Sequence, residues 1–277
     1  MRVWCSEAIK RLFCHQSTTS ISQIQEIIRA VKKDSLIAIP ARMKSSRFPG
    51  KPLASISGKP MIYHVIDRCR ETKLPFPIYV CTDSTEIFDM VEAYGVNGFM
   101  TGEHPTGSDR VAEMANVIGT EFVINVQGDE PIIDPLDIVK THDFLVSSKH
   151  SVVTGFSSLS DTKDFNDINT IKIVKDNFDN LLYVSRAAIP GKKAGNVEGK
   201  AYRQICLYGY TARALKDFAS FRRGSLELSE DHELLRFLEN GIDVGLVELS
   251  EASIPVDVPS DLLLVEAAMK DRSFYRD

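Results

Sequence analysis

The chain has 277 residues, of which 43% are hydrophobic and 26% charged, and its formal net charge is −5 at pH 7. This length suits one large α/β domain or two small ones, and the acidic balance argues against nucleic-acid binding through bulk charge. No apolar run approaches the roughly 18 residues of a membrane span. The five cysteines form no CxxC pair, so we expect a reduced, cytoplasmic protein without a membrane span.

Residues 1–34 form an extension before the first strong strand pattern. Its basic start leaves an organelle transit peptide open as an alternative, although Glu7 and the short length count against one. Apolar residues then recur at helical spacing, at Ile21, Ile24, Ile27, Ile28 and Val31. We therefore expect a helix over residues 21–33, docked on the domain that follows.

From residue 35 onward, short apolar runs alternate with amphipathic segments. Continuous apolar strands between amphipathic helices imply a parallel sheet that is covered on both faces. We expect Asp83 to cap one of these helices. The expected elements are strands at 36–39, 78–82 and 122–126, and helices at 61–71, 86–94 and about 108–117.

The pattern changes after about residue 150, where strands with short connections precede further helices. We see no internal repeat and no low-complexity linker, and we expect one domain over 35–277, with halves at 35–150 and 151–277. The expected elements are strands at 151–157, 170–175, 181–185 and 205–210, and helices at 212–219, 229–240 and 260–270.

The stretch PARMKSSRFPGKPL, residues 40–53, concentrates positive charge directly after the first strand. No acidic residue occurs between Asp34 and Asp67, so nothing nearby in the sequence balances this charge. Loops at the carboxyl ends of parallel strands are where open α/β sheets bind ligands. The four cations of the stretch are Arg42, Lys44, Arg47 and Lys51.

Arginine forks and a lysine ammonium suit the oxygens of a polyphosphate or a carboxylate. Gly50 allows the backbone to approach such a ligand closely. The stretch contains no Walker P-loop and no GxGxxG fingerprint. Composition alone fits a solvated basic loop equally well.

Further motifs resolve this choice by resemblance. PARMKSSRFPGKPL followed by GKPMIYHV resembles the nucleotide-binding loop of 3-deoxy-manno-octulosonate (Kdo) cytidylyltransferases. The resemblance covers about residues 36–270. The other matching segments, in order along the chain, are CTDS at 81–84, TGSDR at 106–110, NVQGDEP at 125–131, SRAAIP at 185–190, LYGY at 207–210, ELLRFLENG at 233–241 and VDVPSDL at 256–262.

The resemblance implies a Rossmann-like nucleotide-diphospho-sugar transferase fold with a smaller β-rich acceptor and dimerisation part. It also implies a homodimer that joins CTP to a 3-deoxy-ulosonic acid and releases pyrophosphate, which activates the sugar for lipopolysaccharide or a related glycan. Residues 35–150 would bind CTP and residues 151–277 the sugar. Positioning and charge neutralisation would supply most of the catalysis.

The resemblance also assigns the CTP side of the site. Arg42 and Lys51 would contact the phosphates, and Arg47 would assist them or bind the sugar carboxylate. Arg110 would orient its loop or touch phosphate, with an exposed helix-surface arginine as the alternative. The base pocket would be formed by Pro40, Ala41, Thr106, Gly107, Ser108 and Gln127.

The reaction would need Mg²⁺ to offset the triphosphate charge, and this ion typically takes one or two carboxylates. The family pairs the positions of Asp129 and Asp257 as ligands. A loop or helix-cap acid is the alternative for Asp257. Glu130 could be a neighbouring ligand, but we expect it to be structural.

On the sugar side, the resemblance selects Arg47, Arg186, Gln204, Tyr208, Glu227 and Glu230. Glu230 and Glu233 would lie on one side of the helix at 229–240, with a solvated helix face as the alternative. We expect His64, His104 and His232 to be surface or internally hydrogen-bonded histidines, since none is spaced as a metal ligand.

Two segments depart from the family pattern. This chain has RQICLYGY where many members have RHLGIYGY, so Gln204 replaces histidine and Cys206 replaces glycine. It has HELLR where many have LEQLR, so Leu234 replaces glutamine. The acceptor could therefore be an 8-amino-Kdo or a nonulosonate instead of Kdo. A degenerate nucleotide-binding module is the non-enzymatic alternative, which the joint presence of Arg42, Lys51, Asp129 and Asp257 disfavours.

Overall fold

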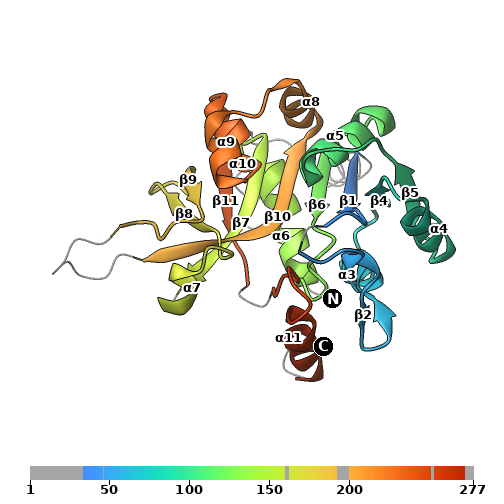
Figure 1. Cartoon of the computed structure of the whole chain (residues 1–277). Coiled ribbons are helices and arrows are strands. Elements are labelled where there is room, and N and C mark those ends of the chain that lie inside the picture. Colours follow the sequence, from blue (N-terminus) through green and yellow to red (C-terminus); the bar gives the residue numbers. More distant parts are fainter. Residues whose placement is uncertain (1–33, 46, 160–161, 192–199, 251–252, 272–277) are drawn as a thin grey trace, which may run out of the picture.

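A nine-stranded sheet forms the centre of the protein, and helices cover both of its faces (Figure 1). The expected helix over residues 21–33 lies outside the part of the chain that the structure describes. The computed structural model describes residues 34–45, 47–159, 162–191, 200–250 and 253–271.

The central strands are parallel and occur in the order β6 (Phe122–Val126), β1 (Ser35–Ala41), β4 (Ile78–Thr82) and β5 (Asn97–Met100). All seven residues of β1 are buried, as an apolar run covered on both faces requires. The α/β class with a parallel sheet centre is therefore confirmed.

The sheet continues beyond β6 through strands of the second half of the chain. β10 (Ala201–Thr211) is antiparallel to β6 and to β7 (Val152–Leu159), and β11 (Val244–Glu248) is parallel to β7. β8 (Lys172–Lys175) and β9 (Leu181–Ser185) branch from β10. With α7 (Thr162–Asn166) they form a small β-rich part on the opposite side of the molecule from α4 and β5 (Figure 1).

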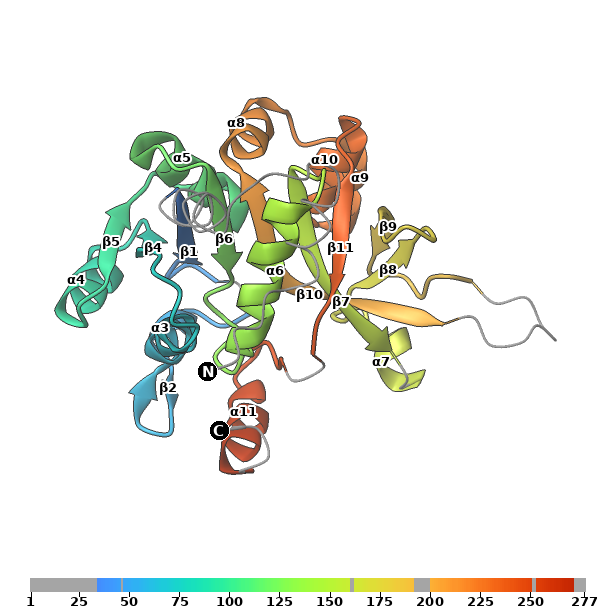
Figure 2. The same cartoon turned by 180° about the vertical axis from the view of Figure 1, so that it is seen from behind.

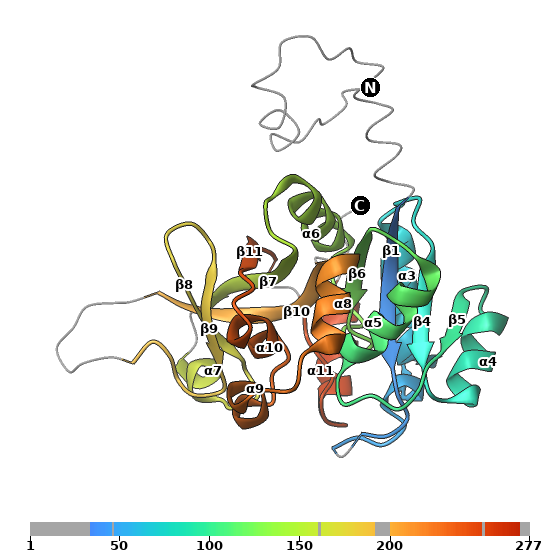
Figure 3. The same ribbon diagram turned by 90° about the horizontal axis from the view of Figure 1, so that it is seen from above.

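Two helix layers bury the two faces of the sheet (Figure 3). Apolar residues of the first layer pack in one core, and α6 crosses this face of the sheet (Figure 2). The first layer contains α3 (Met61–Glu71), α4 (Thr85–Ala93) and α6 (Pro135–Ser147). The second contains α5 (Gly107–Ile118), α8 (Ala212–Ser220) and α10 (Leu234–Glu239).

Helices α5 and α4 begin at side-chain caps. The Thr106 hydroxyl accepts a hydrogen bond from the Asp109 amide and starts α5. Ser84 caps α4 by accepting from the Ile87 amide, so the prediction of Asp83 as the cap was wrong. The Asp83 carboxylate lies 2.9 Å from Arg110 Nη2 instead.

The single helix expected at 229–240 is wrong, because the chain forms α9 (Ser225–Glu230) and α10 with a break between them. Asp231 ends α9 in the left-handed conformation, with φ at 47°. Aspartate tolerates this conformation better than most residues. Glu230 and Glu233 therefore belong to different segments and not to one helix face.

The last described helix packs against the first half of the chain. α11 (Asp261–Lys270) packs with the hairpin of β2 (Ser55–Ile56) and β3 (Lys59–Pro60) through a small apolar cluster that includes Ile56, Val256 and Val265. The Val256 amide donates to the Asp129 carbonyl at 2.9 Å. This packing brings the loop before α11 to the end of β6. Within the described ranges, no helix is long and apolar enough to cross a membrane.

Candidate active site

A polar cleft opens where the end of β1, the start of α5 and the loop after β6 converge. It consists of two adjoining hollows that share several of the charged residues singled out in the sequence. The second hollow extends toward β10 and the break between α9 and α10. The residues common to both hollows are Arg42, Arg47, Thr106, Gln127, Asp129, Arg186, Asp231 and Asp257.

Backbone segments meet closely at the floor of the cleft. A Cβ on Gly128 would lie 2.7 Å from the Pro40 carbonyl oxygen, so no larger residue fits without movement of the backbone. A Cβ on Gly107 would come within 3.2 Å of Pro40 Cγ and 3.3 Å of Gln127 Oε1. The glycines in TGSDR and NVQGDEP thus allow three segments to approach one another beside Pro40 and Ala41.

The two acids expected to form a pair do lie close together. Lys51, the first residue of the short 3-10 helix η1 (Lys51–Leu53), places Nζ 2.6 Å from Asp129 Oδ2 and 3.8 Å from Asp257 Oδ1. The same ammonium donates to the Val256 carbonyl at 2.9 Å. Gly50 precedes η1 with φ at 73°, a conformation that glycine adopts without strain.

The other three cations of the basic stretch differ in their contacts. Arg47 contacts Asp257 Oδ1 at 2.9 Å and Asn169 Oδ1 at 3.1 Å. Arg42 is exposed at the cleft and forms no hydrogen bond or ion pair with another described residue. Lys44 pairs with Glu103 and is absent from the residues that line either hollow. Only part of the basic stretch therefore faces the cleft.

Glu130, next to Asp129, is buried and accepts a hydrogen bond from the Ser253 hydroxyl. Burial, together with the neighbouring Asp129 charge, raises the pKa of its carboxyl to about 8. This internal partner agrees with the structural role expected for Glu130.

The residues of the expected base pocket occupy different environments. Thr106 and Gly107 line the cleft. The Ser108 hydroxyl is buried and lies 2.8 Å from the Tyr210 hydroxyl. Arg110 reaches the edge of the cleft, but it is 2% exposed and its guanidinium contacts Asp83 and Thr101. The alternative of Arg110 as an exposed helix-surface residue is therefore wrong.

Arg186 follows β9 and lines both hollows. Its guanidinium donates to the carbonyl oxygens of Glu230, Ile168 and Asp231, at 2.8, 3.2 and 3.4 Å. The Glu230 carboxylate accepts from the Arg186 amide and from Ser185 Oγ. Glu230 is not among the residues that line the hollows; it holds the chain at Arg186.

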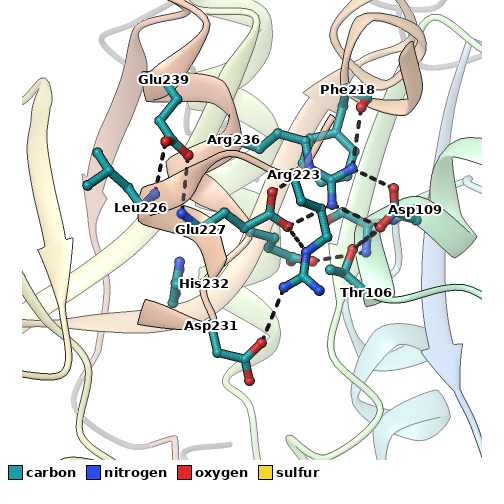
Figure 4. Close-up of polar contacts among 12 residues, drawn as sticks. Thr106, Asp109, Phe218, Arg223, Leu226, Glu227, Asp231, His232, Arg236 and Glu239 are labelled. Carbon is teal, nitrogen blue, oxygen red and sulfur yellow. Dashed lines mark hydrogen bonds and ion pairs between the residues drawn. The ribbon is translucent and has the colours of Figure 1, made fainter. Parts of the chain in front are cut away.

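Glu227 lies elsewhere than the resemblance suggested. Its side chain is fully buried between Arg236 and Arg223, with Oε1 2.7 Å from Arg236 Nη2 and 2.9 Å from Arg223 Nε (Figure 4). It is not part of the lining of either hollow. The sequence motif predicts Glu227 as a sugar-binding residue, but it does not show that other side chains already neutralise its charge.

The three residues that depart from the family pattern occupy different places in the structure. Gln204 and Cys206 line the second hollow beside Tyr208, whereas Leu234 is fully buried in the apolar core. The Gln204 amide nitrogen donates to Thr154 Oγ1 at 3.1 Å, and its oxygen lies 3.2 Å from His232 Nε2. Burial, helped by the nearby Arg186 charge, lowers the His232 pKa to about 4. His232 is thus an internally hydrogen-bonded histidine, as expected.

Several cleft residues were not selected from the sequence, among them Ser45, Asn169, Arg203 and Arg223. Asn169 lies in a loop rich in Asp and Asn before β8, and this composition is a weak signal of a polar loop. Among the described residues, no group of three or more histidine, cysteine, aspartate or glutamate side chains is arranged to hold a metal ion.

The chain is similar to several known proteins. A relative from Shewanella pealeana, named 8-amino-3,8-dideoxy-manno-octulosonate cytidylyltransferase, is 41% identical over 84% of this chain and 97% of its own length. One from Thermodesulfovibrio yellowstonii, named 3-deoxy-manno-octulosonate cytidylyltransferase, is 37% identical over 86% of this chain and 99% of its own.

A solved structure of CMP:2-keto-3-deoxy-manno-octonic acid synthetase complexed with CTP is also similar. It superimposes with a TM-score of 0.80 at 31% identity, over 85% of this chain and 98% of its own. The family model described as cytidylyltransferase matches residues 36–246, which contain most of the residues that line the cleft. The chain therefore belongs to the cytidylyltransferase family.

Proposed function

We propose that this protein transfers CMP from CTP to 3-deoxy-D-manno-octulosonate and releases pyrophosphate. The observation that carries the proposal is the Lys51 ammonium between Asp129 and Asp257, at the carboxyl ends of β1 and β6. It brings together, in one cleft, a cation for phosphate and two carboxylates for a metal ion. The names of the relatives and the CTP complex of the structural neighbour support the choice of substrates.

In this reaction the anomeric hydroxyl oxygen of the sugar forms a bond to the α-phosphorus of CTP. The bond from that phosphorus to the bridging oxygen of the β-phosphate breaks, and pyrophosphate leaves. The protein would chiefly position the two substrates and balance their charge. Arg42, which has no partner among the described residues, and Lys51 would hold the phosphates.

The carboxylates of Asp129 and Asp257 fit Mg²⁺. Both are partly exposed to the cleft, and both lie within 4 Å of the same lysine nitrogen. One or two carboxylates, completed by phosphate oxygens and water, are the usual Mg²⁺ set, whereas a closed cage of protein ligands is not needed. When bound there, the ion would neutralise part of the triphosphate charge.

Arg186 is the cation we assign to the sugar carboxylate. Its guanidinium is oriented by three backbone carbonyls, which fix the side chain but do not cancel its charge. A carboxylate taken from water needs such a cationic partner. Gln204 and Tyr208 would lie along the sugar in the same hollow.

A second acceptor, 8-amino-3,8-dideoxy-manno-octulosonate, is favoured by one feature of the second hollow. Five acidic side chains line it in addition to the proposed metal pair and Glu130, and an ammonium group would be attracted to them. They belong to Asp164, Asp167, Asp231, Glu233 and Asp261. A nonulosonate is the remaining alternative acceptor.

The deciding experiment is coupled pyrophosphate release from the purified full chain with CTP, Mg²⁺ and a panel of ulosonic acids. Turnover with Kdo supports the proposal, and a higher kcat/KM for the 8-amino acid or a nonulosonate would reassign the acceptor. Binding of CTP without turnover of any acid would favour a degenerate nucleotide-binding module.

We further propose a cytoplasmic homodimer that supplies activated sugar for lipopolysaccharide or a related glycan. Light scattering would measure the dimer.

A further inference from the structure

A buried ion cluster lies behind the cleft, at the junction of α5, α8, α9 and α10 (Figure 4). We call the side chains of Arg236, Glu227, Asp109 and Arg223 the Arg236 cluster. Arg236 is 2% exposed and Glu227 is fully buried. The guanidinium of Arg236 also lies 3.8 Å from the centre of the Phe218 ring. Burying so many charges is costly unless each is paired, so their geometry is tightly determined.

Every N–H of the Arg236 guanidinium has an acceptor. Nε donates to Glu227 Oε2 at 2.7 Å, and Nη2 donates to Glu227 Oε1 at 2.7 Å and to Asp109 Oδ2 at 3.1 Å. Nη1 donates to Asp109 Oδ1 at 2.7 Å and to the Phe218 carbonyl at 3.4 Å. Arg236 therefore fixes both carboxylate oxygens of Asp109 as hydrogen-bond acceptors.

Asp109 in turn fixes Thr106, which lines both hollows of the cleft. The Asp109 amide donates to Thr106 Oγ at 3.1 Å, and the Thr106 hydroxyl donates to Asp109 Oδ2 at 2.8 Å. The carboxyl group of Glu233 also lies beside this hydroxyl. A hydroxyl has one proton. Because Asp109 Oδ2 takes this proton, Thr106 has only a lone pair to offer toward the cleft.

We propose that the Arg236 cluster sets the nucleobase preference by holding Thr106 Oγ as a hydrogen-bond acceptor toward the cleft. An acceptor at this position favours a base edge with an amino group, as in cytosine, over one with a carbonyl oxygen, as in uracil. The inference rests on the proposed use of CTP and on the assignment of Thr106 to the base pocket. Arg236 and Asp109 act here as positioning residues, since Thr106 is the one that lines the cleft.

The substitution Asp109→Asn tests whether the direction in which the Thr106 hydroxyl proton points sets the base preference. With the amide oxygen of asparagine at the Oδ1 position, it would accept from Arg236 Nη1, and the NH₂ group at the Oδ2 position would donate to Thr106 Oγ at the cost of the contact with Arg236 Nη2. The threonine proton would then be free to point into the cleft, where it suits a carbonyl oxygen. Thr106→Val removes the acceptor altogether, whereas Thr106→Ser keeps it.

The measurement is the ratio of the dissociation constants for UTP and CTP, each with Mg²⁺, by isothermal titration calorimetry on the full chain. We expect the parent and Thr106→Ser to prefer CTP. The preference should fall about tenfold or more in Asp109→Asn and Thr106→Val, as loss of one buried hydrogen bond predicts. Arg213→Ala is the matched control, because Arg213 is an exposed partner of Asp217 on α8, and its ratio should equal the parent's.

A parent ratio near one overturns the inference, as does an unchanged preference in Thr106→Val. If Asp109→Asn does not fold, Thr106→Val still decides, because it changes none of the four side chains of the cluster, although it removes the hydroxyl that caps α5. The readout is binding and not turnover. A protein that prefers CTP but makes no product therefore supports this inference while it contradicts the proposed function.

Discussion

Lys51 Nζ lies 2.6 Å from Asp129 Oδ2, and this contact joins the basic stretch after β1 to the loop after β6. The pair is largely shielded, since the two side chains are 15% and 28% exposed. Asp257 completes the group from the far end of the chain, 3.8 Å from the same nitrogen. The ammonium therefore neutralises part of the charge on both carboxylates, and each of the three residues can be tested separately.

Asp129→Asn and Asp257→Asn should each lower turnover by orders of magnitude, because each removes a carboxylate proposed to hold Mg²⁺. The affinity for CTP without a divalent ion should change little. Turnover at saturating Mg²⁺ and CTP affinity by calorimetry measure the two effects. Asp89→Asn is the control, since Asp89 is an exposed acid on α4. Near-normal turnover of either cleft variant would exclude that residue as a ligand.

Arg42→Ala and Lys51→Ala should impair the use of CTP more than that of the sugar acid, because both cations are assigned to phosphate. Loss of one charged hydrogen bond costs about 1.5–3 kcal/mol, or roughly 10- to 150-fold in kcat/KM for CTP. Lys44→Ala is a matched control from the same stretch, as Lys44 pairs with Glu103 outside the cleft lining. A rise in KM for the sugar alone would show that the loop serves the other substrate.

The parallel centre of the fold was predictable because its strands are continuous apolar runs and its helices start at recognisable caps. The choice of Asp83 over Ser84 failed because both are good caps and only the backbone geometry selects one. The split between α9 and α10 was missed because apolar spacing continues through Asp231, whose left-handed conformation leaves no trace in periodicity. Residues 135–147, which form α6, and 244–248, which form β11, were not predicted at all.

The candidate site was likewise predictable only in part. The basic stretch and the loop after β6 were identifiable because charge and glycine cluster at strand ends. That Asp129 meets Asp257 depends on the packing of α11 against the β2–β3 hairpin, which no local pattern encodes. Glu227 shows the reverse case. Its motif predicted a sugar-binding residue, whereas in the fold its carboxylate pairs with Arg236.

His232 should make stability depend on pH. Its pKa in the folded protein is about 4, against about 6.5 when unfolded, so the unfolded state binds more protons in between. The free energy of unfolding should therefore fall as pH is lowered from about 6.5 toward 4. In His232→Gln, which keeps an N–H donor for Gln204, this part of the decrease should vanish. Urea unfolding at pH 7 and pH 5 tests it, and equal decreases in both proteins would contradict the assignment.

Arg186→Ala should weaken the sugar acid selectively, since the guanidinium is assigned to its carboxylate. We expect KM for the acid to rise at least tenfold, with KM for CTP nearly unchanged. Arg186 also donates to three backbone carbonyls, so Arg186→Lys serves as a second variant that retains the charge and should recover part of the loss. Equal losses for both substrates, with no recovery in the lysine variant, would indicate a purely structural arginine.

Gln204→His tests which acid is accepted. Of the two departures suspected of tuning the acceptor, Gln204 lines the second hollow, while Leu234 is 0% exposed in the core. The Gln204 carboxamide oxygen can accept a hydrogen bond from an ammonium group, whereas an imidazole replaces it with a ring that can itself carry a proton. The ratio of kcat/KM for Kdo to that for its 8-amino analogue should therefore rise in Gln204→His, by up to about tenfold for one hydrogen bond.

Leu234→Gln is the contrasting variant, because it buries an amide without a partner. It should lower the free energy of unfolding by about 1–3 kcal/mol and leave the acceptor ratio unchanged. If Gln204→His is folded and active but keeps the parent ratio, the glutamine does not discriminate between the acids. Unmodified Kdo would then be the simpler acceptor, since the one departure that reaches the cleft would have no effect on it.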